Sequence, residues 1–206
     1  MHSDERIKQI TNWLGNGSIN IFGRPFSGKD CQSKILADLL SGNMLGAGEI
    51  FRGDDMPERI KECMKNGQLV DSDDFTNLIL NRLDQPKFVG KPLILNSIGR
   101  WHGEEESVLA AAQNSGHSTK AVIYLKMSDN DIYKRLQKLN EIGDRTGRID
   151  DSKDIMKTRI DEFQQKTEPV IDYYKKNGLL TEIDGKNPIE QVTNDILDVL
   201  HKIATY

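Results

Sequence analysis

The stretch from Ser18 to Gln32 constrains the fold more than any other part of this chain. An apolar run, Ser18–Phe22, leads into a loop that is bracketed by Gly23 and Gly28 and followed by Lys29. The glycines let the loop turn its backbone N–H groups inward, and a helix that starts near Lys29 would point its positive dipole end at the same place. This order of strand, glycine loop, lysine and helix predicts a phosphate-binding loop. An ordinary strand–turn–helix connection is the alternative.

The residues after the lysine depart from the usual phosphate-loop pattern. That pattern places Ser or Thr directly after the lysine, where its hydroxyl helps to hold Mg²⁺. Here Asp30 and then Cys31 occupy these positions. The departure therefore concerns the metal rather than the phosphates.

Composition narrows the class of protein. The chain has 206 residues, enough for one α/β domain with a sizeable core, and a net charge of −4 with both signs interspersed. We find no basic cluster with interleaved aromatics and no apolar segment of membrane-spanning length, so we expect no nucleic-acid or membrane partner. Two cysteines and four histidines lack metal-ligand spacing, which predicts reduced thiols and no structural zinc. We expect a cytoplasmic, monomeric protein.

Apolar patterns along the chain predict alternating helices and strands. A helix with Ile7, Ile10 and Leu14 on one side precedes the Ser18–Phe22 strand, and three further strand-like runs follow at 92–95, 121–125 and 179–183. This alternation predicts an α/β fold with a doubly wound parallel sheet. Ligands should bind beyond the carboxyl ends of its strands, where 23–29 and 96–100 fall. The mostly helical region 49–83 and the polar region 140–153 are candidate mobile parts.

Several more segments resemble nucleoside monophosphate kinases of the adenylate kinase and UMP/CMP kinase type. They occur in the family's order and at suitable spacing between Ser18 and Leu200. The segments are the loop with Pro25 in its middle, Gly46-Ala47-Gly48-Glu49-Ile50-Phe51-Arg52, Asn66-Gly67-Gln68-Leu69-Val70, Leu93 to Arg100, Thr146-Gly147-Arg148-Ile149-Asp150-Asp151, Arg159, and Thr167 to Tyr174.

The resemblance implies a P-loop kinase formed by one domain, residues 1–206. Residues 49–83 would form the subdomain that binds the monophosphate, and 140–153 a short lid. Its activity would be reversible phosphoryl transfer from a nucleoside triphosphate, as Mg·ATP, to a nucleoside monophosphate. AMP is slightly favoured over CMP and UMP as the acceptor. Small-molecule nucleotides would be the partners and Mg²⁺ the cofactor.

The resemblance also assigns roles by position. The catalytic charges would be Lys29, Arg100, Arg148 and Arg159. ATP would contact Gly23, Arg24, Pro25, Phe26, Ser27, Gly28, Lys29, Asp30, Cys31, Arg145 and Asn187. The acceptor would contact Ala47, Arg52, Gln68, Leu69, Val70, Ser97, Arg100 and Glu104. The family's lid usually opens with an arginine where this chain has Leu139, and Arg145 could replace it.

Two positions leave alternatives open. Asn96 stands where the family has an aspartate, so Asp30 would either replace that charge as a tentative metal ligand or be a first-turn helix acid. Glu104 could accept a hydrogen bond from an amino group of the acceptor base, or belong to an exposed acidic run, Glu104–Glu106. Asp30, Cys31, Asn96 and Leu139 also allow a nucleotide-binding protein of the same fold with lost or weak catalysis. A kinase acting on another small metabolite is a weaker alternative.

Overall fold

A five-stranded, all-parallel sheet forms the centre of the computed structural model, which describes residues 4–46, 58–66, 68–69, 82–83, 85–142 and 153–206. The spatial order is β2-β3-β1-β4-β5. The strands span Ser18–Gly23 (β1), Asn43–Gly46 (β2), Leu93–Asn96 (β3), Thr119–Lys126 (β4) and Leu180–Asp184 (β5). Because β1 lies between β3 and β4, the chain reverses its winding direction beside the end of β1.

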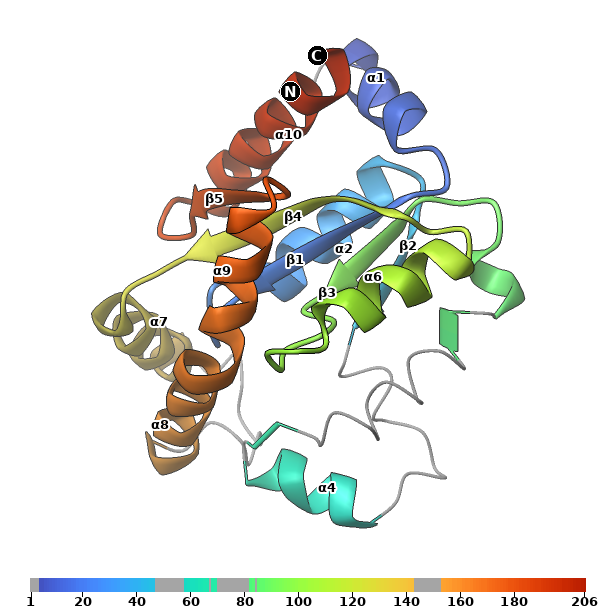
Figure 1. The fold of residues 1–206 in the computed structure, drawn as a ribbon. Coiled ribbons are helices and arrows are strands. Elements are labelled where there is room, and N and C mark those ends of the chain that lie inside the picture. Colours follow the sequence, from blue (N-terminus) through green and yellow to red (C-terminus); the bar gives the residue numbers. More distant parts are fainter. Residues whose placement is uncertain (1–3, 47–57, 67, 70–81, 84, 143–152) are drawn as a thin grey trace.

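Helices cover both faces of the sheet, as Figure 1 shows. The first face carries α1, α2 and α10, and the second carries α6 and α9. The helices span Asp4–Leu14 (α1), Lys29–Leu39 (α2), Glu58–Lys65 (α4), Glu105–Asn114 (α6), Asp129–Ile142 (α7), Lys153–Glu162 (α8), Glu168–Lys176 (α9) and Ile189–Thr205 (α10). The described residues also include a 3₁₀ turn at Pro86–Phe88 and a π-helix at Phe163–Thr167.

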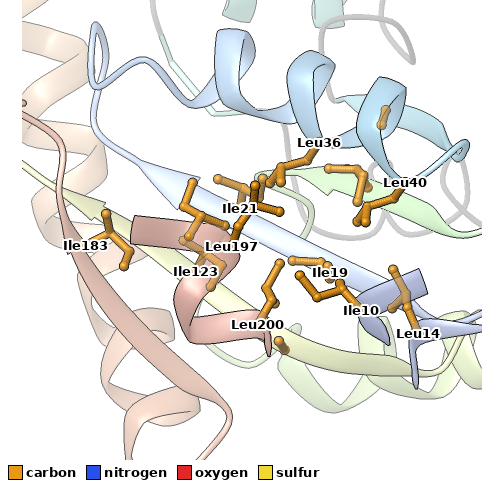
Figure 2. Packing of buried hydrophobic residues seen from close by; sticks show 14 of the residues in the cluster. Ile10, Leu14, Ile19, Ile21, Leu36, Leu40, Ile123, Ile183, Leu197 and Leu200 are labelled. Atoms are coloured by element: carbon orange, nitrogen blue, oxygen red, sulfur yellow. The ribbon is translucent and has the colours of Figure 1, made fainter. Parts of the chain in front are cut away.

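Helices on both faces of the sheet explain why β1 is buried at every position. Ile19 and Ile21 of β1 point to this face, where they meet Leu36 of α2 and Leu197 of α10 (Figure 2). Phe22 of β1 belongs instead to the cluster on the second face. Successive side chains of a strand alternate between faces, so a strand covered on both sides needs apolar residues at nearly every position.

The predicted fold class is confirmed, and so are the four strands that apolar runs predicted. The sheet also contains β2, which the apolar pattern did not reveal because its four residues, Asn43–Gly46, include only two apolar side chains. The candidate mobile regions lie mostly outside the described residues, although α4 falls within 49–83. Among the described helices, none is both long and apolar enough to cross a membrane.

Candidate active site

The loop after β1, the predicted phosphate-binding loop, is compact and leads directly into α2. β1 ends at Gly23 and α2 begins at Lys29, with Gly28 between them at a φ of 90°. The backbone N–H of Ser27 donates to the carbonyl of Arg24 at 3.1 Å, which closes the loop. A Cβ added to Gly23 would lie 2.2 Å from Ser27 Oγ, so this close approach requires glycine. The N-terminal end of α2, the end of a helix that favours anions, follows this loop directly.

Charged residues converge where α2 starts and β3 ends. Lys29 is 10% exposed, and its Nζ lies 4.0 Å from Asp30 Oδ1. Asn96, the last residue of β3, donates from Nδ2 to the same Asp30 oxygen at 2.8 Å. The positive charge of Lys29 and this hydrogen bond lower the pKa of Asp30 to about 2, although its side chain is 71% exposed. Asp30 is therefore a carboxylate at neutral pH.

Two arginines add positive charge to the same place. Arg100 follows β3 and donates from Nε to the carbonyl of Ser97 at 3.1 Å. Burial and the nearby charge of Arg159 lower the pKa of Arg100 to about 10, and both arginines also act on the charge of Asp30. Like charges held together in a largely buried position are unfavourable alone, and a bound anion relieves the repulsion. The arrangement therefore suits a ligand with several negative charges.

Asn20 shapes the loop that carries Arg100, and sequence reasoning missed it. Its Nδ2 donates to the carbonyl of Ile98 at 2.8 Å, and its Oδ1 accepts from the backbone N–H of Ile98 at 3.3 Å. Ser97 next to it adopts a φ of 53°, which is uncommon outside glycine. An asparagine within an apolar strand was the available signal, since a buried amide must find partners.

Arg135 of α7 is a second residue that sequence reasoning missed. Its Nη1 donates to the carbonyl of Phe26 at 3.0 Å, and its Nη2 donates to the carbonyl of Gly185 at 2.9 Å. Asn187, a predicted ATP contact, lies two residues beyond Gly185 in the turn between β5 and α10. Arg135 thus holds this turn beside the phosphate-loop candidate, which is the predicted phosphate-binding loop of residues 23–29.

The predicted acceptor residues are only partly described. Backbone N–H of Leu69 donates to Glu162 Oε2 at 3.2 Å, and that oxygen also pairs with Lys166 Nζ at 2.5 Å. Lys166 Nζ lies 4.0 Å from the ring centre of Trp101, the residue after Arg100. Gln68 is exposed beside Leu69. Ala47, Arg52, Val70, Arg145 and Arg148 lie outside the described residues.

The exposed interpretation of the acidic run is wrong. Glu104 is 3% exposed, and Glu105 is equally buried, whereas Glu106 is exposed. Glu104 Oε2 accepts the backbone N–H of Trp101 at 3.0 Å, which closes the turn before α6. Glu105 Oε2 accepts the backbone N–H of Gly103 at 2.7 Å, so both buried acids satisfy N–H groups of the turn before α6. Residue type alone did not disclose this local preference.

Oxygen atoms suited to a hard cation lie next to the phosphate-loop candidate. Asn96 Oδ1 is buried and, among the residues that the structure describes, has no hydrogen-bond partner. It belongs to the same amide that binds the exposed carboxylate of Asp30. Mg²⁺ binds oxygen ligands and keeps several waters, so this pair fits a magnesium ion held through water. Across the described part of the chain, this site included, no three or more His, Cys, Asp or Glu side chains form a group that could hold a metal ion.

The sequence of this chain is similar to that of a known protein family. The sequence model of the family "Adenylate kinase" matches residues 21–179. An adenylate kinase from Caulobacter vibrioides is 30% identical over 190 residues, covering 89% of this chain and 97% of that protein. Adenylate kinases from Nocardioides sp., at 29% identity, and Methanosarcina barkeri, at 27%, cover 89% and 91% of this chain, and 96% and 100% of their own.

Proposed function

Because this chain belongs to the adenylate kinase family, whose members transfer phosphoryl groups between nucleotides, we propose that it transfers one from Mg·ATP to AMP. The observation that carries this proposal is the convergence of Lys29, Arg100 and Arg159 around Asp30, next to the loop that follows β1. AMP is proposed as the acceptor because the relatives are named adenylate kinases.

Phosphoryl transfer requires mainly that two anionic substrates are aligned and that their charge is neutralised. We assign the loop's backbone N–H groups and Lys29 to the outer phosphates of ATP. Arg100 is assigned to the acceptor phosphate and Arg159 to the phosphoryl group in transit. These roles suit the observed geometry, since both arginines reach the charge of Asp30 at the start of α2.

The magnesium site would use the Asp30–Asn96 pair. When bound, Mg²⁺ would neutralise negative charge that develops on the phosphates during transfer. Asp30 would supply the carboxylate that the family places at the end of β3, and Asn96 Oδ1 would accept a hydrogen bond from a water of the ion. The negative charge would thus have moved from the strand end to the helix start.

Regions 49–83 and 140–153 are proposed as the acceptor subdomain and the lid. Arg52 and Arg148, in these regions, would complete the charge around the phosphates, and Arg145 would replace the arginine that is absent at Leu139. Exclusion of water from the closed site would protect the transferring group from hydrolysis.

A coupled assay tests the proposal directly. ATP is supplied with AMP, CMP, UMP or GMP, and diphosphate formation is followed with Mg²⁺ and with EDTA. We expect the highest kcat/KM with AMP and no turnover in EDTA. Lys29→Met, purified in parallel, is the matched control, because it reports any kinase carried over from the expression host. Nucleotide binding without turnover would refute the proposed activity, and a higher kcat/KM with CMP or UMP would refute the proposed acceptor.

A further inference from the structure

Arg24 lies in the phosphate-loop candidate, but its side chain is turned toward two helices. Its Nη1 pairs with Asp129 Oδ1, and its Nη2 donates to Glu168 Oε1 at 2.6 Å. Asp129 is the first residue of α7, and Glu168 is the first residue of α9. One guanidinium therefore joins the loop after β1 to the N-terminal ends of two helices from the second half of the chain.

The surroundings of Arg24 keep this bridge in one geometry. Its side chain is only 13% exposed, and its guanidinium carbon lies 5.9 Å from the ring centre of Phe163. That ring stacks on Tyr124 of β4 at 6.2 Å. Burial by itself would lower the pKa of Arg24, but the hydrogen bond to Glu168 and the charge of Asp129 outweigh it and raise the pKa. The guanidinium of Arg24 is therefore charged at neutral pH and packs against the ring of Phe163.

The loop needs such outside support. Phe26 adopts a φ of 61°, a conformation that costs free energy for a residue with a bulky side chain. Its carbonyl accepts the hydrogen bond from Arg135 of α7. Arg24, through Asp129, and Arg135, through the carbonyl of Phe26, therefore both link the loop to α7, and Arg24 adds the link to α9.

Asp129 and Glu168 would be unfavourable neighbours for a triphosphate if they were not neutralised. Both are about half exposed, and both lie within hydrogen-bond distance of a residue of the loop. A guanidinium can pair with both carboxylates at once, since its donors point in different directions.

We propose that Arg24 is a positioning residue that fixes the phosphate loop to α7 and α9 and neutralises Asp129 and Glu168, without binding ATP through its own side chain. This inference rests on the proposed function, in which the loop receives the donor nucleotide. It differs from the expectation from the sequence, which placed Arg24 among the groups that touch ATP.

The test uses the full chain and four variants: Arg24→Gln, Glu168→Gln, Asp129→Asn, and Arg24→Gln combined with both partner substitutions. Calorimetric titration measures the Kd for ATP and for AMP, and thermal denaturation reports folding. We expect Arg24→Gln to weaken ATP binding about tenfold, because two carboxylates lose their counter-charge, and AMP binding less than about threefold. Neutralising both partners should then recover most of the loss.

Three other results would overturn the proposal. If the combined variant stays as weak as Arg24→Gln while Glu168→Gln tightens ATP binding, the side chain is a direct ligand of ATP. If Arg24→Gln weakens ATP and AMP binding equally and lowers Tm, its role is only structural. Unchanged ATP binding in Arg24→Gln would exclude both positioning and neutralisation. Because the readout is binding, an inactive wild-type chain would refute the proposed activity and leave this comparison intact.

Discussion

Replacing Asn96 with aspartate tests whether Asp30 has taken over the charge of the strand end. Asn96 Nδ2 lies 2.8 Å from Asp30 Oδ1, so Asn96→Asp would bring two carboxylate oxygens to about that separation. At an effective dielectric constant of about 40–80, as suits the exposed side of Asp30, two unit charges at this distance repel by about 1.5–3 kcal/mol. Without metal, Asn96→Asp should lower the free energy of unfolding by about this amount at pH 7.

The background variant isolates the interaction. In Asp30→Gly the second charge is absent, so Asn96→Asp should cost much less, and the difference between backgrounds is the coupling free energy. Asp30→Asn is the matched control, because it removes the charge without placing glycine in the first turn of α2. Wild type, Asp30→Gly and Asp30→Asn are each prepared with and without Asn96→Asp. Urea denaturation of these six proteins in EDTA gives their free energies of unfolding. An equal cost of Asn96→Asp with and without Asp30 would refute the reasoning.

Magnesium dependence gives the functional half of this prediction. If Asp30 orients the ion or its waters, Asp30→Gly should raise the Mg²⁺ concentration needed for half-maximal rate, and adding Asn96→Asp should bring it back toward the wild-type value. If Asp30 is only a first-turn acid that repels the triphosphate, Asp30→Gly should tighten ATP binding and leave the Mg²⁺ requirement unchanged. Tighter ATP binding together with an unchanged Mg²⁺ requirement in Asp30→Gly would show that Asp30 has not replaced the aspartate that the family has at the position of Asn96.

Two more outcomes follow from the charges at the start of α2. Lys29→Met should reduce kcat/KM at least about a hundredfold, or about 3 kcal/mol, because it removes the charge that the proposed function assigns to the outer phosphates of ATP. A rate within a few-fold of wild type, at unchanged Tm, would contradict the proposed role of the loop. The pKa of Asp30 lies near 2, below its ordinary 3.8, so it stabilises the fold above pH 4 and this contribution disappears as the pH falls through 2. Lowering the pH from 5 to 2 should therefore reduce the free energy of unfolding of wild type more than that of Asp30→Asn, by about 1 kcal/mol after allowance for solvent screening. Parallel plots of the free energy of unfolding against pH for the two proteins would contradict this prediction.

Local sequence determined the central part of the fold. The apolar runs predicted four of the five strands, because a parallel strand with helices on both faces must be apolar at nearly every position. Gly23, Gly28 and Lys29 predicted a phosphate-binding loop, because the turn of such a loop into a helix start depends on local sequence. The apolar pattern did not predict β2, because only Met44 and Leu45 are apolar in it. Its pairing with β3 makes it a strand.

Only the tertiary structure decided which polar side chains meet. Asp30 and Asn96 are 66 residues apart in the chain, and they form a hydrogen bond because the order of the strands puts the end of β3 beside the end of β1. The position of Arg24 in the loop predicts a contact with phosphates, but its side chain pairs with Asp129 and Glu168 at the N-terminal ends of α7 and α9. Residue type and spacing specify what a side chain can bind, whereas packing of distant elements determines which partner lies within reach.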